Sequence, residues 1–247
     1  MQGAPIFLYT DFGSSDIYVG QVKSVLHDAA PASAVIDLLN DVPSFDIAAA
    51  AHLLAALAPQ LPAGAITIAV VDPGVGTARD AIAVEADARW FVGPDNGLMS
   101  VVTARARASR CFSLRGMPEP QSASFHGRDL FAPAAAALAR LPGPSFLIPK
   151  RKLDVQLPAE DLAQIIYIDH YGNTMTGIRA GAVMRTMHVR VGTQLVGHAR
   201  VFAEAPLWQC FWYENSIGLL EIAANRASAA AILDLKVGQF VGFGLPG

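Results

Sequence analysis

An apolar run that stops at a carboxylate constrains the fold of this chain more than any other feature. The segment "GAITIAVVD", residues 64–72, is almost entirely apolar until it reaches Asp72. A strand that is apolar on both of its faces is typical of the middle of a parallel sheet, where helices cover each side. We therefore interpret this run as a central strand of an α/β sheet.

Strand and helix patterns alternate before and after this run. "PIFLYT" precedes the helical pattern "SSDIYVGQVKSVLHDAA", and "AVIDLL" precedes "SFDIAAAAHLLAALA", for which Ser44 is the expected N-cap. "AIAVEA" and "RWFVGPDNG" form a predicted hairpin, and "GRDLFAPAAAALARL" a predicted helix. The alternation predicts an α/β N-terminal domain with a largely parallel sheet over residues 1–143.

The pattern changes after this domain. Residues 142–158 are rich in proline and poor in periodicity, so we predict a linker over residues 144–160, with a solvated basic cluster at Lys150, Arg151 and Lys152. Beyond it the apolar segments are short, often alternating, and bounded by glycine or asparagine. Residues 161–247 are therefore predicted to form a small all-β barrel domain.

Composition excludes several classes of protein. Hydrophobic residues make up 53% and charged residues 16%, which is typical of a globular chain, and a net charge of −3 gives no footprint for nucleic acid. The longest helical apolar stretch, residues 46–58, is shorter than the roughly 20 residues that span a membrane. The N-terminus lacks the basic region of a signal peptide, and Cys111 and Cys210 lie far apart as expected of reduced thiols. These features predict a cytoplasmic protein without a membrane or nucleic-acid partner.

Polar side chains collect where the predicted strands end. Asp11 follows the first strand, Asp72 the central one and Asp95 the hairpin, while His126 stands just before a helix. Because ligands bind beyond the carboxyl ends of parallel strands, this edge is the candidate site.

Each of these residues also has a purely structural explanation. Asp11 is placed to cap the next helix, Asp72 to hold its loop through an ion pair with Arg79, and Asp129 to pair with Arg128. The mixture of acidic, basic and imidazole groups favours a site over four independent caps.

Known site motifs are missing from the sequence. It contains no P-loop, no complete dinucleotide fingerprint, no GxSxG nucleophile turn, and none of the HExxH, CxxC or paired-histidine spacings of metal sites. We therefore predict neither a metal ion nor a cofactor.

Six motifs taken together resemble one family. "TDFG", "VVDPGVGTAR", "GPDNGL", "SFHGRD", "YGN" and "NSIGLLEIAAN" occur here in the order found in the S-adenosylmethionine (SAM) hydroxide adenosyltransferases, relatives of the SAM-dependent fluorinase and chlorinase. The resemblance covers essentially the whole chain.

The resemblance implies an enzyme that hydrolyses SAM, its substrate, to adenosine and methionine by attack of water or hydroxide on ribose C5′. The family's water-activating residues fall on Asp72, Arg79 and His126. The family also implies a homotrimer, with SAM between the N-terminal domain of one subunit and the C-terminal domain of its neighbour.

Substrate-binding positions carry over as well. Asp11 matches the ribose-binding aspartate, Asn173 and Asn225 match positions near adenine, and Asp169 and Ser216 match positions near the methionine amino end. The sequence departs from the halogenases at Ile217, where they tend to have arginine, so the methionine carboxylate lacks an obvious partner.

Two other functions stay open at this point. A halogenase is disfavoured because its relatives carry tyrosine in place of Asp72, and an anionic Asp72 repels halide. A non-catalytic SAM or adenosine sensor is disfavoured because it needs no water-activating set. The aromatic residues Trp208, Trp212 and Tyr213 either stack on adenine or, as we favour, pack in the core of the second domain.

Overall fold

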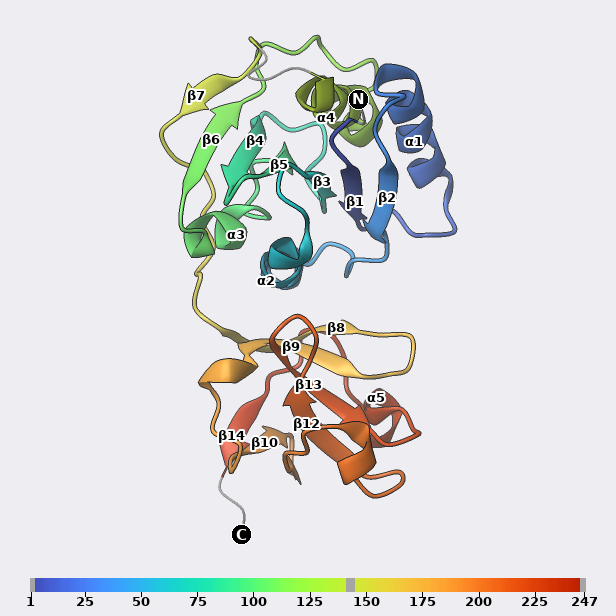
Figure 1. Ribbon diagram of the computed structural model, residues 1–247, viewed down its shortest axis with the longest axis vertical. Helices are drawn as coiled ribbons and strands as arrows, with labels where there is room; N and C mark the ends of the chain where they lie inside the picture. Colours follow the sequence, from blue (N-terminus) through green and yellow to red (C-terminus); the bar gives the residue numbers. More distant parts are fainter. Residues whose placement is uncertain (1–2, 141–144, 245–247) are drawn as a thin grey trace. The chain divides into compact units, whose positions relative to one another are not determined.

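The chain divides into two compact units in the computed structural model, which describes residues 3–140 and 145–244. The units cover Met1–Ala159 and Glu160–Gly247. Figure 1 shows the helices and sheet of the first unit and the smaller sheets of the second.

A seven-stranded sheet with the order β2-β1-β3-β5-β4-β6-β7 forms the centre of the first unit. Four strands are parallel to one another: β2 (Val35–Leu39), β1 (Ile6–Thr10), β3 (Ile66–Val70) and β5 (Arg89–Pro94). The remaining three pair antiparallel: β4 (Ala81–Ala86), β6 (Ser109–Ser113) and β7 (Ile148–Lys150). The α/β class is confirmed, and the sheet is mixed because the predicted β4–β5 hairpin reverses its direction.

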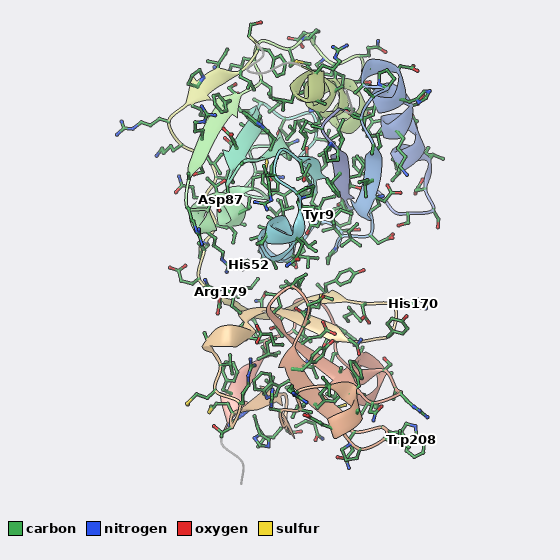
Figure 2. All side chains as sticks on the ribbon, in the orientation of Figure 1. Tyr9, His52, Asp87, His170, Arg179 and Trp208 are labelled. Atoms are coloured by element: carbon green, nitrogen blue, oxygen red, sulfur yellow. The ribbon has the colours of Figure 1, made fainter. Side chains whose placement is uncertain are left out.

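Helices cover both faces of this sheet (Figure 1). Helix α1 (Ile17–Ala29) packs with α4 (Ala132–Arg140), and α2 (Ile47–Leu57) packs with α3 (Ser100–Arg105). On β1, Leu8 lies in the apolar cluster with α1 and α4, whereas the hydroxyl of the next residue, Tyr9, donates to Ala50 O of α2 at 2.8 Å (Figure 2). This two-sided cover explains why all five residues of β3 are buried.

The start of α2 differs from the expected one. Asp46 is the N-cap, and its carboxylate accepts from Ala49 N at 2.9 Å, while Ser44 is exposed two residues earlier. Between them Phe45 has a φ of 66°, which turns the chain before the helix begins. The prediction of Ser44 as the cap is wrong for this reason.

The predicted linker contains a strand of the first unit. Strand β7 pairs with β6 at the edge of the sheet, where Pro149 is tolerated because an edge strand leaves one side unpaired. Lys150 is not a solvated residue: its side chain is 14% exposed and its ammonium lies 2.9 Å from Asp80 and 3.0 Å from Asp95. The expected boundary at residues 143 and 144 lies outside the described residues.

Two antiparallel sheets and one short helix, α5 (Ala229–Leu233), build the second unit. The larger sheet joins β12 (Cys210–Glu214), β13 (Leu219–Ala224), β9 (Thr174–Arg179) and β8 (Leu162–Ile168). The smaller joins β11 (Gln194–Val196), β10 (His188–Val191) and β14 (Gly242–Gly244). Trp212, fully buried, and Ile222 lie in the core of this unit.

The sequence also led to expectations about membrane-spanning helices and about the two cysteines, and both can be compared with the described residues. Within these ranges, every helix falls short of the length and apolarity needed to cross a membrane. Cys111 and Cys210 are both free and half-buried, and burial raises the pKa of each thiol.

Candidate active site

The carboxyl ends of β1 and β3 bring two aspartates to one edge of the sheet. The two strands pair in register, with Thr10 opposite Val70, and the amide of Asp11 donates to Val70 O at 3.2 Å. Asp72 follows β3 by two residues. Adjacent strand ends therefore place Asp11 and Asp72 near each other, as the α/β pattern predicts.

The loop after β3 is built around one guanidinium. Arg79 forms an ion pair with Asp72 and also donates to Gly74 O and, at 3.2 Å, to Thr77 Oγ1. The Asp72 and Arg79 side chains are only 6% and 16% exposed. A Cβ at Gly74 would lie 2.6 Å from the guanidinium, so a larger residue there would force the Arg79 side chain to shift.

His126 reaches the same region from another loop. Gly76, with a φ of 81°, lies so close to the loop before His126 that an added Cβ would stand 3.0 Å from Ala123 O. Arg79 and His126 both line a cavity of about 280 Å³, which Phe131 also lines. The structure thus brings together the three residues predicted to activate water.

Burial changes the acidity of both aspartates. It raises the pKa of Asp72, an effect that the positive charge of Arg79 opposes, and His126 lies close enough to the same carboxylate to interact with it electrostatically. It also raises the pKa of Asp11, and the charge of Asp72 adds to that increase. A carboxylate whose pKa is raised is a better hydrogen acceptor than an ordinary aspartate, which suits a group that orients water.

The structure tests the purely structural explanations given above for Asp11 and for the pair of Arg128 and Asp129. Asp16, not Asp11, caps α1, and the Asp11 carboxylate instead accepts from Phe45 N at 3.4 Å. Arg128 does form a local ion pair with Asp129, at 2.6 Å. Asp11 is therefore available at the sheet edge, whereas Arg128 and Asp129 hold each other.

A second candidate pocket belongs to the second unit alone. It has a volume of about 730 Å³, and Asp169, Asn173 and Ser216 all line it. Asp169 accepts from Asn173 N at 2.8 Å and from Asn173 Nδ2 at 2.9 Å, so the two predicted binding residues are locked together. His170, beside Asp169, lies on the exposed turn between β8 and β9 (Figure 2).

Asn225 is placed differently from the other predicted binding residues. Its side-chain nitrogen donates to Ala205 O at 2.7 Å and its backbone oxygen accepts from Trp208 N at 2.9 Å. Among the described residues that line the 730 Å³ pocket, Asn225 does not occur.

The three aromatic residues have three different environments. Trp212 is fully buried and donates through Nε1 to Met187 O, whereas the Trp208 side chain is 69% exposed (Figure 2). Tyr213 lines the 730 Å³ pocket. Core packing is therefore confirmed for Trp212, and Tyr213 packs against the apolar cluster of Ala205, Phe211 and Ala223 while it also lines the pocket.

Glu221 is a member of this pocket that sequence reasoning missed. It lies on β13, lines the pocket and is only 2% exposed. The signal in the sequence is a single acidic residue inside the apolar strand "LLEIAA". A buried carboxylate is costly unless it is bonded, so such an interruption indicates a specific role.

The described residues also contain no group of three or more histidine, cysteine, aspartate or glutamate side chains arranged to hold a metal ion.

Comparison with known families agrees with this arrangement. Residues 6–145 match the N-terminal domain of SAM hydroxide adenosyltransferase, and residues 163–242 match the C-terminal domain. The chain belongs to the SAM hydroxide adenosyltransferase family. The two matched regions fall in the two compact units.

The more similar relatives of this chain share one name, and more distant ones carry another. The (R)-S-adenosyl-L-methionine hydrolase of Thermus thermophilus is 40% identical over 95% of this chain and 97% of its own length. The enzyme of the same name from Salinispora arenicola is 37% identical over 93% and 94%. A fluorinase from Nocardia brasiliensis is more distant, at 24% identity over 95% of each chain.

Solved structures share the whole architecture. A crystal structure of an uncharacterized conserved protein from Thermotoga maritima superposes with a TM-score of 0.87 at 29% identity. The match covers 96% of this chain and 99% of that one, so both units of this SAM hydroxide adenosyltransferase family member have counterparts there.

Proposed function

We propose that this protein hydrolyses SAM to adenosine and L-methionine. The observation that carries the proposal is the grouping of Asp72, Arg79 and His126 beside Asp11 at the carboxyl edge of the sheet. Relatives named (R)-S-adenosyl-L-methionine hydrolase, up to 40% identical over nearly the whole chain, support the same reaction.

The chemistry needs a nucleophile more than an acid. The sulfonium of SAM leaves as a neutral thioether, so its departure requires no proton. Water is a poor nucleophile, but a guanidinium such as that of Arg79 favours the hydroxide form of a neighbouring water. Asp72 and His126 accept hydrogen bonds from that water and orient its lone pair, and one of these two groups takes its proton as the new C5′–O bond forms and the C5′–S bond breaks.

Asp11 fixes the carbon that is attacked. Its carboxylate accepts hydrogen bonds from the two ribose hydroxyls, which holds C5′ in line with the activated water. Alignment of this kind supplies much of the rate acceleration in displacement reactions.

The pocket of the second unit takes the other parts of the substrate. Asp169 and Ser216 bind the methionine amino end, and Asn173 binds near adenine. Because the amide nitrogen of Asn225 is bonded to Ala205, its side-chain oxygen is the atom it would offer to the adenine amino group.

We further propose that the enzyme works as a cytoplasmic homotrimer in which neighbouring subunits complete each site. Enclosure between subunits would exclude competing water and strengthen the electrostatic interactions. SAM is the substrate, and the reaction requires neither a cofactor nor a metal ion.

Two alternatives are less well supported. A SAM-dependent halogenase is favoured only by the distant fluorinase relatives, and the anionic Asp72 would repel a halide. A SAM or adenosine sensor would have no use for a buried acid, guanidinium and imidazole around one point.

Product analysis distinguishes these functions. Purified protein is incubated with SAM in the presence and absence of chloride or fluoride, and the products are separated by chromatography. We expect adenosine and methionine under all conditions. Release of adenosine no faster than in buffer alone would contradict the proposal, and a 5′-halogenated nucleoside would establish the halogenase.

A further inference from the structure

Glu221 is a buried carboxylate that the proposed reaction does not use. It lies on β13 with 2% of its surface exposed, and both of its oxygens are bonded to neutral donors. Tyr213 Oη donates to Oε1 at 2.5 Å, and Asn215 Nδ2 donates to Oε2 at 2.8 Å. A carboxylate held only by neutral groups in a core is destabilising by itself, so its presence calls for a function.

Asn215 connects this carboxylate to the turn between β12 and β13. Its side-chain oxygen accepts from Ile217 N at 3.1 Å and from Leu219 N at 2.9 Å, while its side-chain nitrogen faces Glu221. The side chain therefore spans from the buried acid to the backbone of the turn. Asn215 itself is 8% exposed.

Ser216 sits in this turn. It is exposed and lines the 730 Å³ pocket, directly between Asn215 and Ile217. The orientation of Ser216 therefore depends on hydrogen bonds that pass through Asn215. Because Glu221 accepts from Asn215 Nδ2, it fixes which end of the amide faces the turn.

We propose that Glu221 is a positioning residue of the substrate pocket, which sets the orientation of Asn215 and so holds the turn that carries Ser216. This proposal rests on the proposed function and deepens it, since it assigns to Glu221 the ordering of the part of the pocket that binds the methionine end of SAM.

Electrostatics agrees with this assignment. Burial raises the pKa of Glu221, and the charge of Asp169, which lines the same pocket, raises it further. The methionine amino end of SAM is cationic, so its arrival stabilises both carboxylates. An apolar core residue would hold neither Asn215 nor this favourable potential.

Substitution of Glu221 and Asn215 tests the connection. We expect Glu221→Ala and Asn215→Ala each to raise the KM for SAM by about tenfold, with kcat changed by less than about threefold. Because both act on one turn, the double variant should be no worse than either single one. Glu221→Gln, which keeps an oxygen for Asn215 Nδ2, should restore KM to within about threefold of the unmodified protein.

Two controls separate positioning from general damage. Glu214→Ala removes an exposed carboxylate of the neighbouring strand and should leave KM unchanged. The dissociation constant for adenosine, which lacks the methionine end, should also be unchanged in Glu221→Ala. Circular dichroism checks that each variant is folded.

The proposal is overturned if Glu221→Ala weakens adenosine and SAM binding equally, or if the effects of the two alanine substitutions add. If Glu221→Ala does not fold, an unchanged KM in Asn215→Ala overturns it alone. Should the unmodified protein release no adenosine from SAM, the hydrolase proposal fails by itself. Calorimetric dissociation constants for SAM then replace KM and decide the role of Glu221 separately.

Discussion

At the scale of single residues, the site depends on one guanidinium with several partners. Arg79 binds the Asp72 carboxylate, the Gly74 carbonyl and Thr77 Oγ1, so its position is set by backbone as well as by charge. Such a group orients its neighbours with little loss of side-chain entropy on substrate binding. Arg79 is therefore both the support of the loop and the cation that would face the nucleophilic water.

Removal of the water-activating groups should affect turnover more than binding. We expect His126→Ala and Arg79→Ala to lower kcat by about 100-fold or more, because each loses an interaction made in the transition state. The dissociation constant for SAM should change by less than about tenfold. Single-turnover kinetics and calorimetry measure the two quantities.

A matched histidine serves as the control for this prediction. His27 is exposed near the end of α1, and His27→Ala should leave both quantities unchanged. Equal losses of turnover and binding in His126→Ala would mean that His126 only maintains the structure.

The acidity of Asp72 predicts the pH dependence of the reaction. Its pKa is raised by burial, and the ionised form is the one that accepts a hydrogen from water. As pH falls, Asp72 therefore becomes protonated earlier than an ordinary aspartate, and kcat/KM should fall with it. Carboxyl NMR titration of the free protein should give Asp72 the same midpoint as this acid limb.

Asp129 provides the internal comparison for that titration. Its ion pair with Arg128 lowers its pKa, so it should stay ionised below the range in which Asp72 titrates. An Asp72 that titrates below the usual range of aspartate, or an acid limb unrelated to its titration, would contradict the assignment.

At the scale of elements, most of the framework could be predicted because its signals are local. The apolar run before Asp72 indicated a covered central strand, and β3 is buried throughout. The alternation of patterns likewise predicted which strand ends meet, and so the grouping of Asp11 and Asp72. The water-activating role of Arg79 and His126 was assigned through the family motifs, since nothing local to either residue indicates that their loops touch.

Other features depend on contacts between distant residues and could not be predicted in this way. The N-cap of α2 is Asp46 and not the predicted Ser44, because Phe45 between them adopts a positive φ. Strand β7 was not predicted, because the prolines in and around it are typical of a linker. It is defined by its pairing with β6, which is distant in the sequence. Glu221 was passed over because its partners become visible only when the hairpin of β12 and β13 is formed.

The ion pairs of Lys150, at the end of β7, predict that this lysine stabilises the folded protein. Lys150 lies against Asp80 and Asp95, and the Asp95 side chain is only 1% exposed. Removal of the ammonium in Lys150→Met leaves that carboxylate buried without its cation. We expect the free energy of unfolding to fall by about 3 kcal/mol, as measured by urea denaturation.

The neighbouring lysine offers the matched control. Lys152 is exposed, so Lys152→Met should change the free energy of unfolding by less than about 0.5 kcal/mol. If the two variants are equally stable, Lys150 does not stabilise the fold through its ion pairs and behaves as the solvated lysine first predicted from the sequence.

At the scale of the whole molecule, the predicted site residues belong to both units. The acid, guanidinium and imidazole belong to Met1–Ala159, and the pocket with Asp169 and Ser216 belongs to Glu160–Gly247. SAM is long enough to offer its ribose to the first set of residues and its methionine end to the second. If neighbouring subunits supply the two sets, as we propose, the defects of two inactive variants should complement each other.

Mixed oligomers test whether two neighbouring subunits supply the two halves of one site. Asp72→Asn disables the first unit and Asp169→Ala the second, and each protein alone should have little activity. Coexpression should restore about a quarter of the normal activity, because random assortment pairs two intact halves at that frequency. Activity no greater than that of the separate variants would contradict sites shared between subunits.

The central claim, that a water molecule held by Asp72, Arg79 and His126 attacks ribose C5′, is tested most directly by isotope transfer. The protein is incubated with SAM in water enriched in the heavy stable oxygen isotope, and the products are weighed by mass spectrometry. The account predicts heavy oxygen in the 5′-hydroxyl of adenosine and unlabelled methionine. Heavy oxygen in homoserine, with release of 5′-methylthioadenosine, would place the attack on the amino-acid chain and contradict it.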